Sequence, residues 1–352
     1  MSLNRLAASG LLLVTLFISA CGRKTVVEQT VIEQSFSSEV SPLTSEAREE
    51  FNEIFDISDA AGDNEEILGA YFYGLSNSDE VKKEIRMSSD GLHLEITHNN
   101  IGAKAGIGWL SFIDGIPQKP VCDDKEIYMP VMTVDKGAET KISMTIIPNF
   151  DVKKTVHRFD IACIFEPGYG PEEENPTYGV YGSELPLLPY EIVGECKEAE
   201  TTLVDTFGEI CEIPEFVLAR YTKQNRDGTT DSRIEKSDLI TDLSIGEEIL
   251  QDVICFKYSL EAYLLLCGKL NETYRITAFM NNEPCVVFNG KSTVDASVAS
   301  GKLTKLPIRI EGTDLTTGCN TLFFVLIPIS EENRDMDLLL TKTKPYAVKK
   351  EK

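Results

Sequence analysis

The residues with the most specific chemistry in this sequence lie near its start, at Ile18-Ser19-Ala20-Cys21. They end an apolar run, Leu6–Ile18, that follows a short segment with one cation, Arg5. The run is shorter than the roughly 20 residues of a membrane-spanning helix and is typical of a signal peptide. The two residues before Cys21 are small, as a signal peptidase requires, and the Cys21 thiol can form a thioether with diacylglycerol.

This stretch resembles the lipobox of bacterial lipoprotein signal peptides. The resemblance implies removal of residues 1–20 and acylation of Cys21. A buried methylene contributes about 0.8 kcal/mol, so two acyl chains make a stable anchor. We therefore expect the protein to contact the membrane through acyl chains on Cys21 and to face the extracytoplasmic side. An ordinary secretory signal that contains a cysteine by chance is the alternative.

Eight further cysteines follow Cys21, and an exported chain can form disulfides. Cys196 and Cys211 flank one polar segment and are the pair that the sequence favours for a disulfide. The alternative is that the cysteines are free and buried, which suits Cys163 because it alternates with apolar residues in a predicted strand. The absence of a Cys-x-x-Cys motif leaves a zinc knuckle or a thioredoxin-type site without support.

The sequence has no motif for catalysis, for a cofactor or for a metal. Its three histidines are His93, which should point outward from a strand, and His98 and His157 at predicted strand ends. They do not form the His-x-x-x-His spacing of a zinc hydrolase. Neither a Gly-x-Ser-x-Gly nucleophile elbow nor a phosphate-binding loop is present. We therefore expect a protein that is not an enzyme.

Acidic residues are abundant, and two of them could converge for glycoside cleavage, which keeps a carbohydrate-active enzyme as an alternative. The segment Asp56–Asp63 superficially suggests a calcium loop, but Ala60 and Ala61 break the EF-hand pattern. Asp227-Gly228 with Asp231 has the composition of a plain turn. Neither segment is therefore predicted to bind calcium.

Two aromatic groups could form a platform for a carbohydrate or a protein. They are Tyr71-Phe72-Tyr73, whose two tyrosines should share one strand face, and Tyr178 with Tyr181. The alternative is that these rings fill the core on one side of a sheet and cover the sheet surface on the other.

The net charge of −23 limits the partners of this chain. Nucleic acid is an unlikely partner because its phosphates would be repelled, and the acidic body should stand off anionic lipid. The acidity is more simply explained by solubility than by cation binding. A hydrophobic content of 42% indicates a globular body rather than a disordered one.

Period-two alternation dominates the chain from about Leu68 and predicts half-buried strands, as at Leu92-His93-Leu94 and Ile142–Ile146. Further strands are predicted in the second half. They are Phe216–Tyr221, Val253–Tyr258, Tyr263–Cys267, Tyr274–Met280, Leu306–Ile310 and Leu322–Ile327. The one helix candidate is Pro42–Phe55, which Ser41 could cap. Helices do not alternate with strands, which disfavours an α/β fold.

The predicted fold is mostly β, with two tandem antiparallel Ig-like β-sandwich domains and a short N-terminal helix. The lipidated cysteine and a polar tether occupy residues 21–41, and the first sandwich covers 42–167. A linker rich in Pro, Gly and Glu covers 168–189, within the stretch Glu166–Pro189 that begins with Glu-Pro-Gly-Tyr-Gly-Pro and holds further prolines. The second sandwich covers 190–330, and a polar tail covers 331–352.

The two halves contain similar blocks in the same order, which suggests a duplication. Ile107–Pro117 resembles Tyr274–Pro284, since each has a strand, a turn pair and a proline two residues later. The block 107–118 is also similar to blocks in uncharacterised tandem β-domain lipoproteins of Gram-positive bacteria. That group implies no catalytic or binding residues.

We therefore expect a lipid-anchored protein of the cell envelope with a non-catalytic binding or structural role, and with a protein or a glycan as its ligand. A carbohydrate-active enzyme or a solute-binding accessory lipoprotein is the alternative function.

Overall fold

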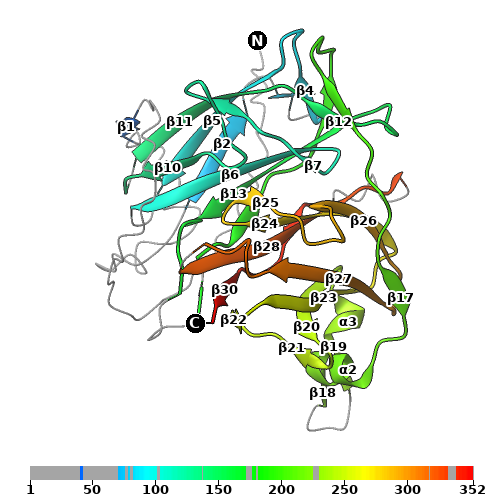
Figure 1. The fold of residues 1–352 in the computed structure, drawn as a ribbon. Helices are drawn as coiled ribbons and strands as arrows, with labels where there is room; N and C mark the ends of the chain where they lie inside the picture. Colours follow the sequence, from blue (N-terminus) through cyan, green and yellow to red (C-terminus); the bar gives the residue numbers. More distant parts are fainter. Residues whose placement is uncertain are drawn as a thin grey trace, which may run out of the picture.

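The computed structural model of this chain describes residues 40–42, 70–75, 78–79, 82–100, 104–136, 138–171, 177–179, 181–224, 230–316, 318–331 and 338–351. The fold is mostly β, as predicted, and its four larger sheets stack as layers from the top to the bottom of Figure 1. We name them, in that order, outer sheet 1, inner sheet 1, inner sheet 2 and outer sheet 2.

Outer sheet 1 and inner sheet 1 come from the first half of the chain. Outer sheet 1 has the strand order β2-β5-β11-β8-β9, with β1 beside β11. Its strands are β1 (Val40–Pro42), β2 (Ala70–Leu75), β5 (Leu92–Asn100), β8 (Val121–Cys122), β9 (Lys125–Glu126) and β11 (Ala138–Ile146). Inner sheet 1 has the order β10-β6-β13-β15-β4-β3, with β7 beside β6 and β14 beside β13. Its strands are β3 (Ser78–Asp79), β4 (Glu84–Arg86), β6 (Ala105–Ile113), β7 (Ile116–Pro117), β10 (Val131–Val134), β13 (Arg158–Phe165), β14 (Glu184–Pro186) and β15 (Tyr190–Val193).

Inner sheet 2 and outer sheet 2 come from the second half. Inner sheet 2 has the order β22-β30-β28-β24-β25, with β26 beside β24 and β29 beside β28. Its strands are β22 (Val253–Phe256), β24 (Glu272–Met280), β25 (Glu283–Pro284), β26 (Thr293–Val298), β28 (Cys319–Pro328), β29 (Thr341–Lys342) and β30 (Tyr346–Lys350). Outer sheet 2 has the order β17-β27-β23-β20-β21. Its strands are β17 (Glu209–Cys211), β20 (Ile240–Ile245), β21 (Glu248–Ile249), β23 (Ser259–Cys267) and β27 (Leu303–Glu311).

In the part of the chain that the structure describes, two further pairs of strands lie outside these layers. The parallel pair is β12 (Asn149–Asp151) with β16 (Glu200–Thr202), and the antiparallel pair is β18 (Thr222–Gln224) with β19 (Thr230–Ser232).

Burial along the strands explains why the sequence forms outer and inner layers. In β11 of outer sheet 1, buried and more exposed residues alternate, so only one face of the sheet is covered. In β13 and β28 of the inner sheets, nearly every residue is buried. A continuous apolar run is typical of a strand that is covered on both faces. The runs Ile161–Phe165 and Leu322–Pro328 therefore place these strands in the middle of the molecule.

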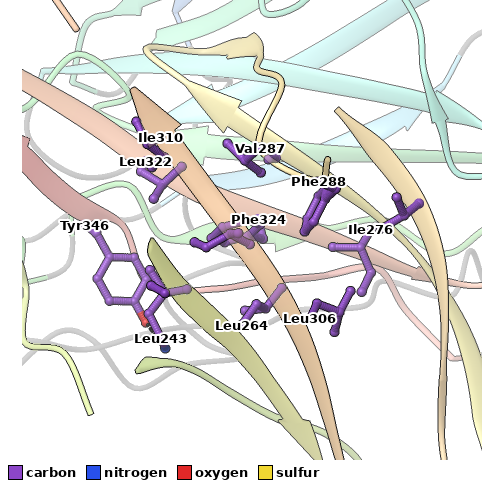
Figure 2. Packing of buried hydrophobic residues seen from close by; sticks show 14 of the residues in the cluster. Leu243, Leu264, Ile276, Val287, Phe288, Leu306, Ile310, Leu322, Phe324 and Tyr346 are labelled. Carbon is purple, nitrogen blue, oxygen red and sulfur yellow. Dashed lines mark hydrogen bonds between the residues drawn. The ribbon is translucent and has the colours of Figure 1, made fainter. Parts of the chain in front are cut away.

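Each half has its own hydrophobic core between its outer and its inner sheet. In the first half, Leu94 and Ile142 of outer sheet 1 pack in one cluster with Trp109 and Ile161 of inner sheet 1. In the second half, residues of outer sheet 2 and of inner sheet 2 interdigitate in the same way (Figure 2). The labelled members of this cluster are Leu243, Leu264, Ile276, Val287, Phe288, Leu306, Ile310, Leu322, Phe324 and Tyr346.

A third core joins the two halves, because the two inner sheets pack with their remaining faces together. Phe112 of inner sheet 1 meets Phe279 of inner sheet 2 edge to face, with ring centroids 6.1 Å apart. Phe279 also stacks on Phe323 at 5.2 Å. We call this cluster the junction core; it is Leu110, Phe112, Met129, Ala162, Ile164, Phe279, Phe323, Val325, Ile327 and Leu340.

The inner sheets of the two halves have the same strand order. Inner sheet 1 has the order β10-β6-β13-β15-β4, and inner sheet 2 has β26-β24-β28-β30-β22 in the corresponding places. In both, the last two strands run parallel. Both turn pairs have two residues at positive φ, 52° and 75° at Asp114-Gly115 and 52° and 72° at Asn281-Asn282. Such turns match the twist of a hairpin.

One predicted strand is a helix. Phe216–Tyr221 lies in α2 (Glu215–Tyr221), which buries Val217 and Tyr221. Buried residues four apart share a helix face, and a short apolar run alone does not distinguish a helix from a strand. Together with α3 (Arg233–Lys236), α2 forms a small core that includes Leu265 and Leu303 of outer sheet 2.

Three predicted segment assignments are also wrong. The segment 331–352, predicted to be a polar tail, contains β30, whose Tyr346 and Val348 are fully buried between β22 and β28. The second domain was predicted to begin at residue 190, but Tyr190–Val193 is β15 of inner sheet 1. The segment 168–189, predicted to be a linker, contributes β14 to the same sheet. The predicted helix 42–55 lies outside the described residues, except that Pro42 ends β1.

Candidate functional site

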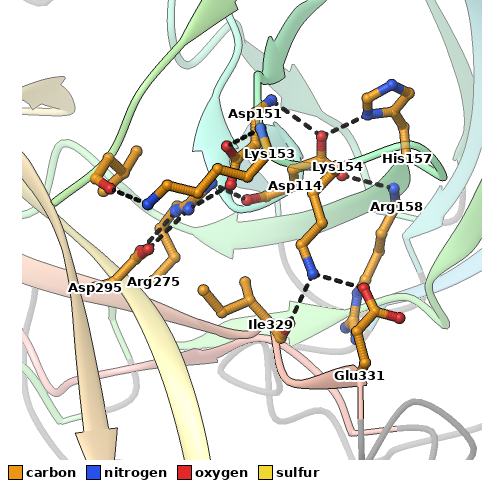
Figure 3. A network of polar contacts seen from close by, with 11 residues as sticks. Asp114, Asp151, Lys153, Lys154, His157, Arg158, Arg275, Asp295, Ile329 and Glu331 are labelled. Atoms are coloured by element: carbon orange, nitrogen blue, oxygen red, sulfur yellow. Dashed lines mark hydrogen bonds and ion pairs between the residues drawn. The ribbon is translucent and has the colours of Figure 1, made fainter. Parts of the chain in front are cut away.

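The most elaborate polar arrangement in the described part of the chain surrounds Arg275, where the two halves meet (Figure 3). Arg275 of β24 is 1% exposed. Its Nε and one terminal nitrogen donate to the carboxylate of Asp295 in β26, at 2.7 and 2.9 Å. The same terminal nitrogen donates to Asp151 Oδ2 of the first half at 2.7 Å. The other terminal nitrogen donates to the Asp114 carbonyl oxygen at 2.8 Å. Arg275 thus binds three groups and joins both halves.

Asp114 is the second centre of this network and is almost fully buried. Its carboxylate accepts hydrogen bonds from the backbone nitrogens of Asp151 and Arg158, at 3.1 and 3.0 Å. It also lies 2.7 Å from Nδ1 of His157, whose ring stacks on Phe150. The carboxylate therefore ties the turn after β6 to the segment between β12 and β13.

The turn before β7 is shaped to admit Arg275. Gly115 has a φ of 75°, and a Cβ at this position would lie 2.9 Å from Arg275 Cβ. A side chain here would suffer both backbone strain and a collision. The Asp-Gly pair that the sequence marks as a turn is therefore also the surface against which the arginine packs.

The charges of this network compensate one another. Burial opposes ionisation of Asp151, but the backbone N–H of Lys153 and the Arg275 guanidinium hold the pKa of Asp151 below its ordinary value. Burial alone would lower the pKa of Arg275, yet Asp295 and Asp151 raise it. A buried cation with two carboxylates is retained only where such geometry is good.

Further contacts between the halves surround the Arg275 network. Lys154 Nζ donates to the Ile329 carbonyl oxygen at 3.0 Å and to Glu331 Oε1 at 2.7 Å. Arg158 holds the buried Asp160 with two nitrogens and donates to the Leu338 carbonyl oxygen at 2.7 Å. Burial raises the pKa of Asp160, and the Arg158 charge opposes this rise.

A second charged pair, the half-buried Glu184 with the buried Lys342, lies elsewhere between the inner sheets. The Lys342 backbone nitrogen donates to Glu184 Oε1 at 3.2 Å, and its Nζ lies 4.8 Å from the Phe323 ring centre. Burial lowers the pKa of Lys342 to about 8, and the Glu184 charge opposes this fall. Burial likewise raises the pKa of Glu184.

A small pocket lies beside this pair, and its cavity volume of about 10 Å³ leaves room for about one water molecule. Its lining includes Glu166, Tyr169, Tyr178, Asn282, Thr321 and Lys342. Pockets that hold drug-sized ligands usually have volumes of about 300–1,000 Å³. This pocket is therefore too small to serve as a typical ligand site.

The arrangement resembles a structural clamp more than a reaction centre. The carboxylates around Arg275 are occupied by the arginine, by His157 or by backbone donors. Within the described ranges, no three His, Cys, Asp or Glu residues are placed to hold a metal ion. In the same ranges no helix has the length and apolar character needed to cross a bilayer.

The expected disulfide is not formed. Cys196 and Cys211 are free thiols. They lie on different cores, because Cys196 packs against the first core and Cys211 of β17 against the helix-covered face of outer sheet 2. Cys163 is a buried free thiol, as the alternation predicted, and burial raises its pKa. Cys21 lies outside the described residues.

The histidines do not converge on one site. His93 is exposed on β5, as predicted. His98 lies within β5 rather than at its end, is fully buried and meets Trp109 edge to face. Burial lowers the pKa of His98 to about 4. His157 precedes β13 and belongs to the Arg275 network.

The structure describes the side chains of only some of the aromatic residues that were predicted to form a platform. Tyr178 is buried and its hydroxyl lies 2.9 Å from Thr321 Oγ1, while Tyr169 stacks on Tyr181 at 4.1 Å. The backbone of Tyr71 and Tyr73 lies in β2, opposite Asn99 and Thr97 of β5. The segments Asp56–Asp63 and Asp227-Gly228 lie outside the described residues, and Asp231 lies in β19.

Sequence reasoning missed Arg275, although one signal was present. Arg275 is the single cation inside an otherwise uncharged run, Thr273–Met280, that was predicted to be a strand. A charge within an apolar strand is rarely buried without a partner. Its partners Asp151 and Asp295 could not be inferred, because they come from distant positions.

Comparisons with known proteins do not assign a family. No protein-family model and no curated protein matches the chain. Fibronectin(III)-like modules of CbhA from Clostridium thermocellum align with 80% of this chain and 94% of their own, at 7% identity and a TM-score of 0.20. Red sea bream transglutaminase aligns with 88% of this chain and 34% of its own, at 10% identity and a TM-score of 0.21. A protein of unknown function from Porphyromonas gingivalis aligns with 79% of this chain and 99% of its own, at 9% identity and a TM-score of 0.21. At such TM-scores the likeness carries neither a topology nor an activity over to this chain.

Proposed function

We propose that this chain is a lipid-anchored protein of the bacterial envelope whose β-rich body has a non-catalytic binding or structural role. The observation that carries the proposal is the clamp at the junction, where Arg275 and its carboxylates bind one another rather than a free surface. Such a clamp stabilises the shape of the body on the cell surface. It leaves no free carboxylate of the network to react with a substrate.

The proposed architecture is two Ig-like β-sandwich domains in tandem, packed with their inner sheets together. It is supported by the separate core that each half builds between two sheets and by the equal strand order of the halves. The junction core and the Arg275 network then act as the contact between the domains.

The proposed anchor is a diacylglyceryl group on Cys21, which follows from the resemblance of Ile18–Cys21 to a lipobox. The tether and the acidic body support this placement, because a strongly negative body has no electrostatic attraction to anionic lipid. Membrane attachment then depends on the acyl chains alone.

Metabolic labelling with an alkyne analogue of palmitate in a bacterial host tests the anchor. The chain should be labelled and should sediment with membranes, whereas Cys21→Ala should lose both properties. Cys255→Ala is the matched control, because Cys255 is an exposed thiol that should not be acylated. Label that persists in Cys21→Ala, or membrane sedimentation that does not change, would contradict the anchor.

A glycan array and a hydrolysis screen on the chain that begins at residue 21 test the non-catalytic role. Binding without turnover would support a binding module. The absence of both binding and turnover would support a structural role. Hydrolysis of a glycan would overturn the proposal in favour of the carbohydrate-active enzyme.

A further inference from the structure

The two halves differ at one equivalent sheet edge. In inner sheet 1, β4 pairs with β15 on one side. On its other side, β4 pairs with the short strand β3 through Ser78 and Asp79. In inner sheet 2, β22 occupies the same place beside β30. No strand of the described ranges pairs with the other side of β22. Among the described residues, β22 thus has an unpaired edge, whereas β3 covers the equivalent strand β4.

Hydrogen bonds to β30 show which backbone groups of β22 are free. The carbonyl oxygens of Asp252 and Phe256 accept hydrogen bonds from Ala347 and Glu351, at 2.7 and 2.9 Å. In a parallel ladder, every second residue of a strand bonds to the same neighbour. The N–H and C=O groups of Val253 and Cys255 therefore point away from β30, toward the side on which no described strand pairs with β22.

The side chains at this edge favour pairing with another strand. The run Val253-Ile254-Cys255-Phe256 contains neither a proline nor a charge, which are the usual protections of an edge. Cys255 is exposed, and the ring of Tyr258 just beyond the strand is 77% exposed. Lys257 follows the strand, and Lys350 lies opposite Phe256. The edge is thus apolar, with the acidic Asp252 directly before it and Lys257 directly after it.

The N-terminal part of the chain contains a segment whose composition fits this edge. Thr25-Val-Val-Glu-Gln29 is followed directly by Thr30-Val-Ile-Glu-Gln34, so a β-branched pentapeptide occurs twice. Residues Thr, Val and Ile favour strands. Glu28 and Glu33 are complementary in charge to Lys257 and Lys350.

We propose that residues Thr25–Gln34 of a second copy of this chain add a strand to the free edge of β22. The ladder supplies backbone hydrogen bonds from Val253 and Cys255, and the neighbouring lysines receive the two glutamates. This mode, the addition of an extended segment to a sheet edge, is a common form of peptide recognition. The proposal does not depend on acylation of Cys21.

The length of chain between the segment and β1 favours a second copy over the same one. β1 pairs with β11 in outer sheet 1, whereas β22 lies in inner sheet 2, two layers away. Packed sheets are about 10 Å apart, so the perpendicular separation alone is about 20 Å. Residues 35–39 can span only about 20 Å when fully extended. No length then remains for a path around inner sheet 1.

Disulfide trapping with Cys255 as the native reporter tests the pairing. The chain that begins at residue 21 and carries Cys21→Ser receives one of four substitutions: Val26→Cys, Val27→Cys, Val31→Cys or Ile32→Cys. Mild oxidation should give a reducible covalent dimer with a peptide that links the new cysteine to Cys255. Because adjacent strand residues point to opposite faces, one member of each neighbouring pair should cross-link and the other should not. The same chains with Cys255→Ser should lose the dimer.

A backbone variant tests the ladder without a disulfide. Cys255→Pro removes an N–H that points away from β30, so β22 should keep its bonds to β30 while the added strand is blocked. Sedimentation of the Cys21→Ser chain should show association that increases with concentration and is lost in Cys255→Pro but kept in Cys255→Ser. An unchanged thermal midpoint shows that the body is intact. If the proline variant is misfolded, Lys257→Glu should weaken the association and Glu28→Lys with Glu33→Lys should restore it.

Three outcomes would overturn the proposal. One is a monomer at all concentrations with no cross-link to Cys255. Another is a cross-link found only within single chains, which would place the segment on its own copy. The third is a dimer whose cross-linking does not differ between neighbouring positions, which would indicate collision rather than a strand.

Discussion

The single buried side chain of Arg275 joins groups from both halves of this molecule. It donates four hydrogen bonds, to two carboxylates and one carbonyl oxygen, and these acceptors come from both halves. Such an arrangement is costly to disturb on one side only, because the remaining charges stay buried without a partner.

We therefore expect Arg275→Met to destabilise the protein by about 3–5 kcal/mol. Asp151 and Asp295 would remain as buried carboxylates without their cation. Replacing them together in Arg275→Met/Asp151→Leu/Asp295→Leu should restore most of the loss. Urea unfolding measures both effects, and a single variant that is as stable as the parent chain would show that the network is not formed.

The burial of His98 predicts that the free energy of unfolding decreases in acid. Its pKa is about 4 in the folded chain, against an ordinary value near 6.5, because burial disfavours the charged ring. Above pH 6.5 the ring is neutral in both states. Between pH 6.5 and 4 only the unfolded chain binds the proton, so the free energy of unfolding should fall by about 3 kcal/mol.

The measurement is the unfolding free energy as a function of pH for the parent chain and for His98→Phe. The variant keeps an aromatic ring beside Trp109 but cannot bind a proton, so its stability should fall less between pH 6.5 and 4. Equal slopes for the two chains in this interval would show that His98 is charged when folded.

Among the elements, two hairpin turns allow the effect of a glycine-to-alanine substitution to be compared. Gly115 and Gly246 both have positive φ, 75° and 57°, but a Cβ would collide with Arg275 only at Gly115. Gly115→Ala should therefore cost more than Gly246→Ala, which adds about 1 kcal/mol of backbone strain alone. Thermal midpoints of the two variants check this. Equal losses would mean that Arg275 does not pack on the turn.

Strands were the elements that the sequence predicted well. Alternation revealed the half-buried strands, and the apolar run at Leu322–Ile327 marked a strand that proves to be buried on both faces. The α2 helix was missed because its apolar run is too short for its period to be distinguished. Lys349 and Lys350 made β30 resemble a tail, although the preceding Tyr346-Ala347-Val348 forms the buried centre of the strand. Local patterns do not show which distant strand a segment will join.

For the site, the sequence indicated the turn at Asp114 and the equivalent turn at Asn281, but not the ion pairs around them. Pairing of Arg275 with Asp151 depends on how two sheets pack, and the sequence separation of these residues carries no such information. The preferred disulfide failed for the same reason, since Cys196 and Cys211 are close in sequence but pack on different cores.

In the whole molecule, the junction joins the two halves into a single cooperative body. The sole tryptophan, Trp109, lies in the core of the first half and reports on that half alone. Phe324 lies in the core of the second half, away from the junction core. Phe324→Ala should cost about 3–5 kcal/mol.

Unfolding of Phe324→Ala, followed by Trp109 fluorescence, is the most direct test of this claim. If the halves unfold together, the fluorescence midpoint should fall as far as the midpoint from far-ultraviolet circular dichroism. A Trp109 midpoint equal to that of the parent chain, with an earlier loss of the remaining β signal, would show that the halves unfold independently and would contradict a single cooperative body.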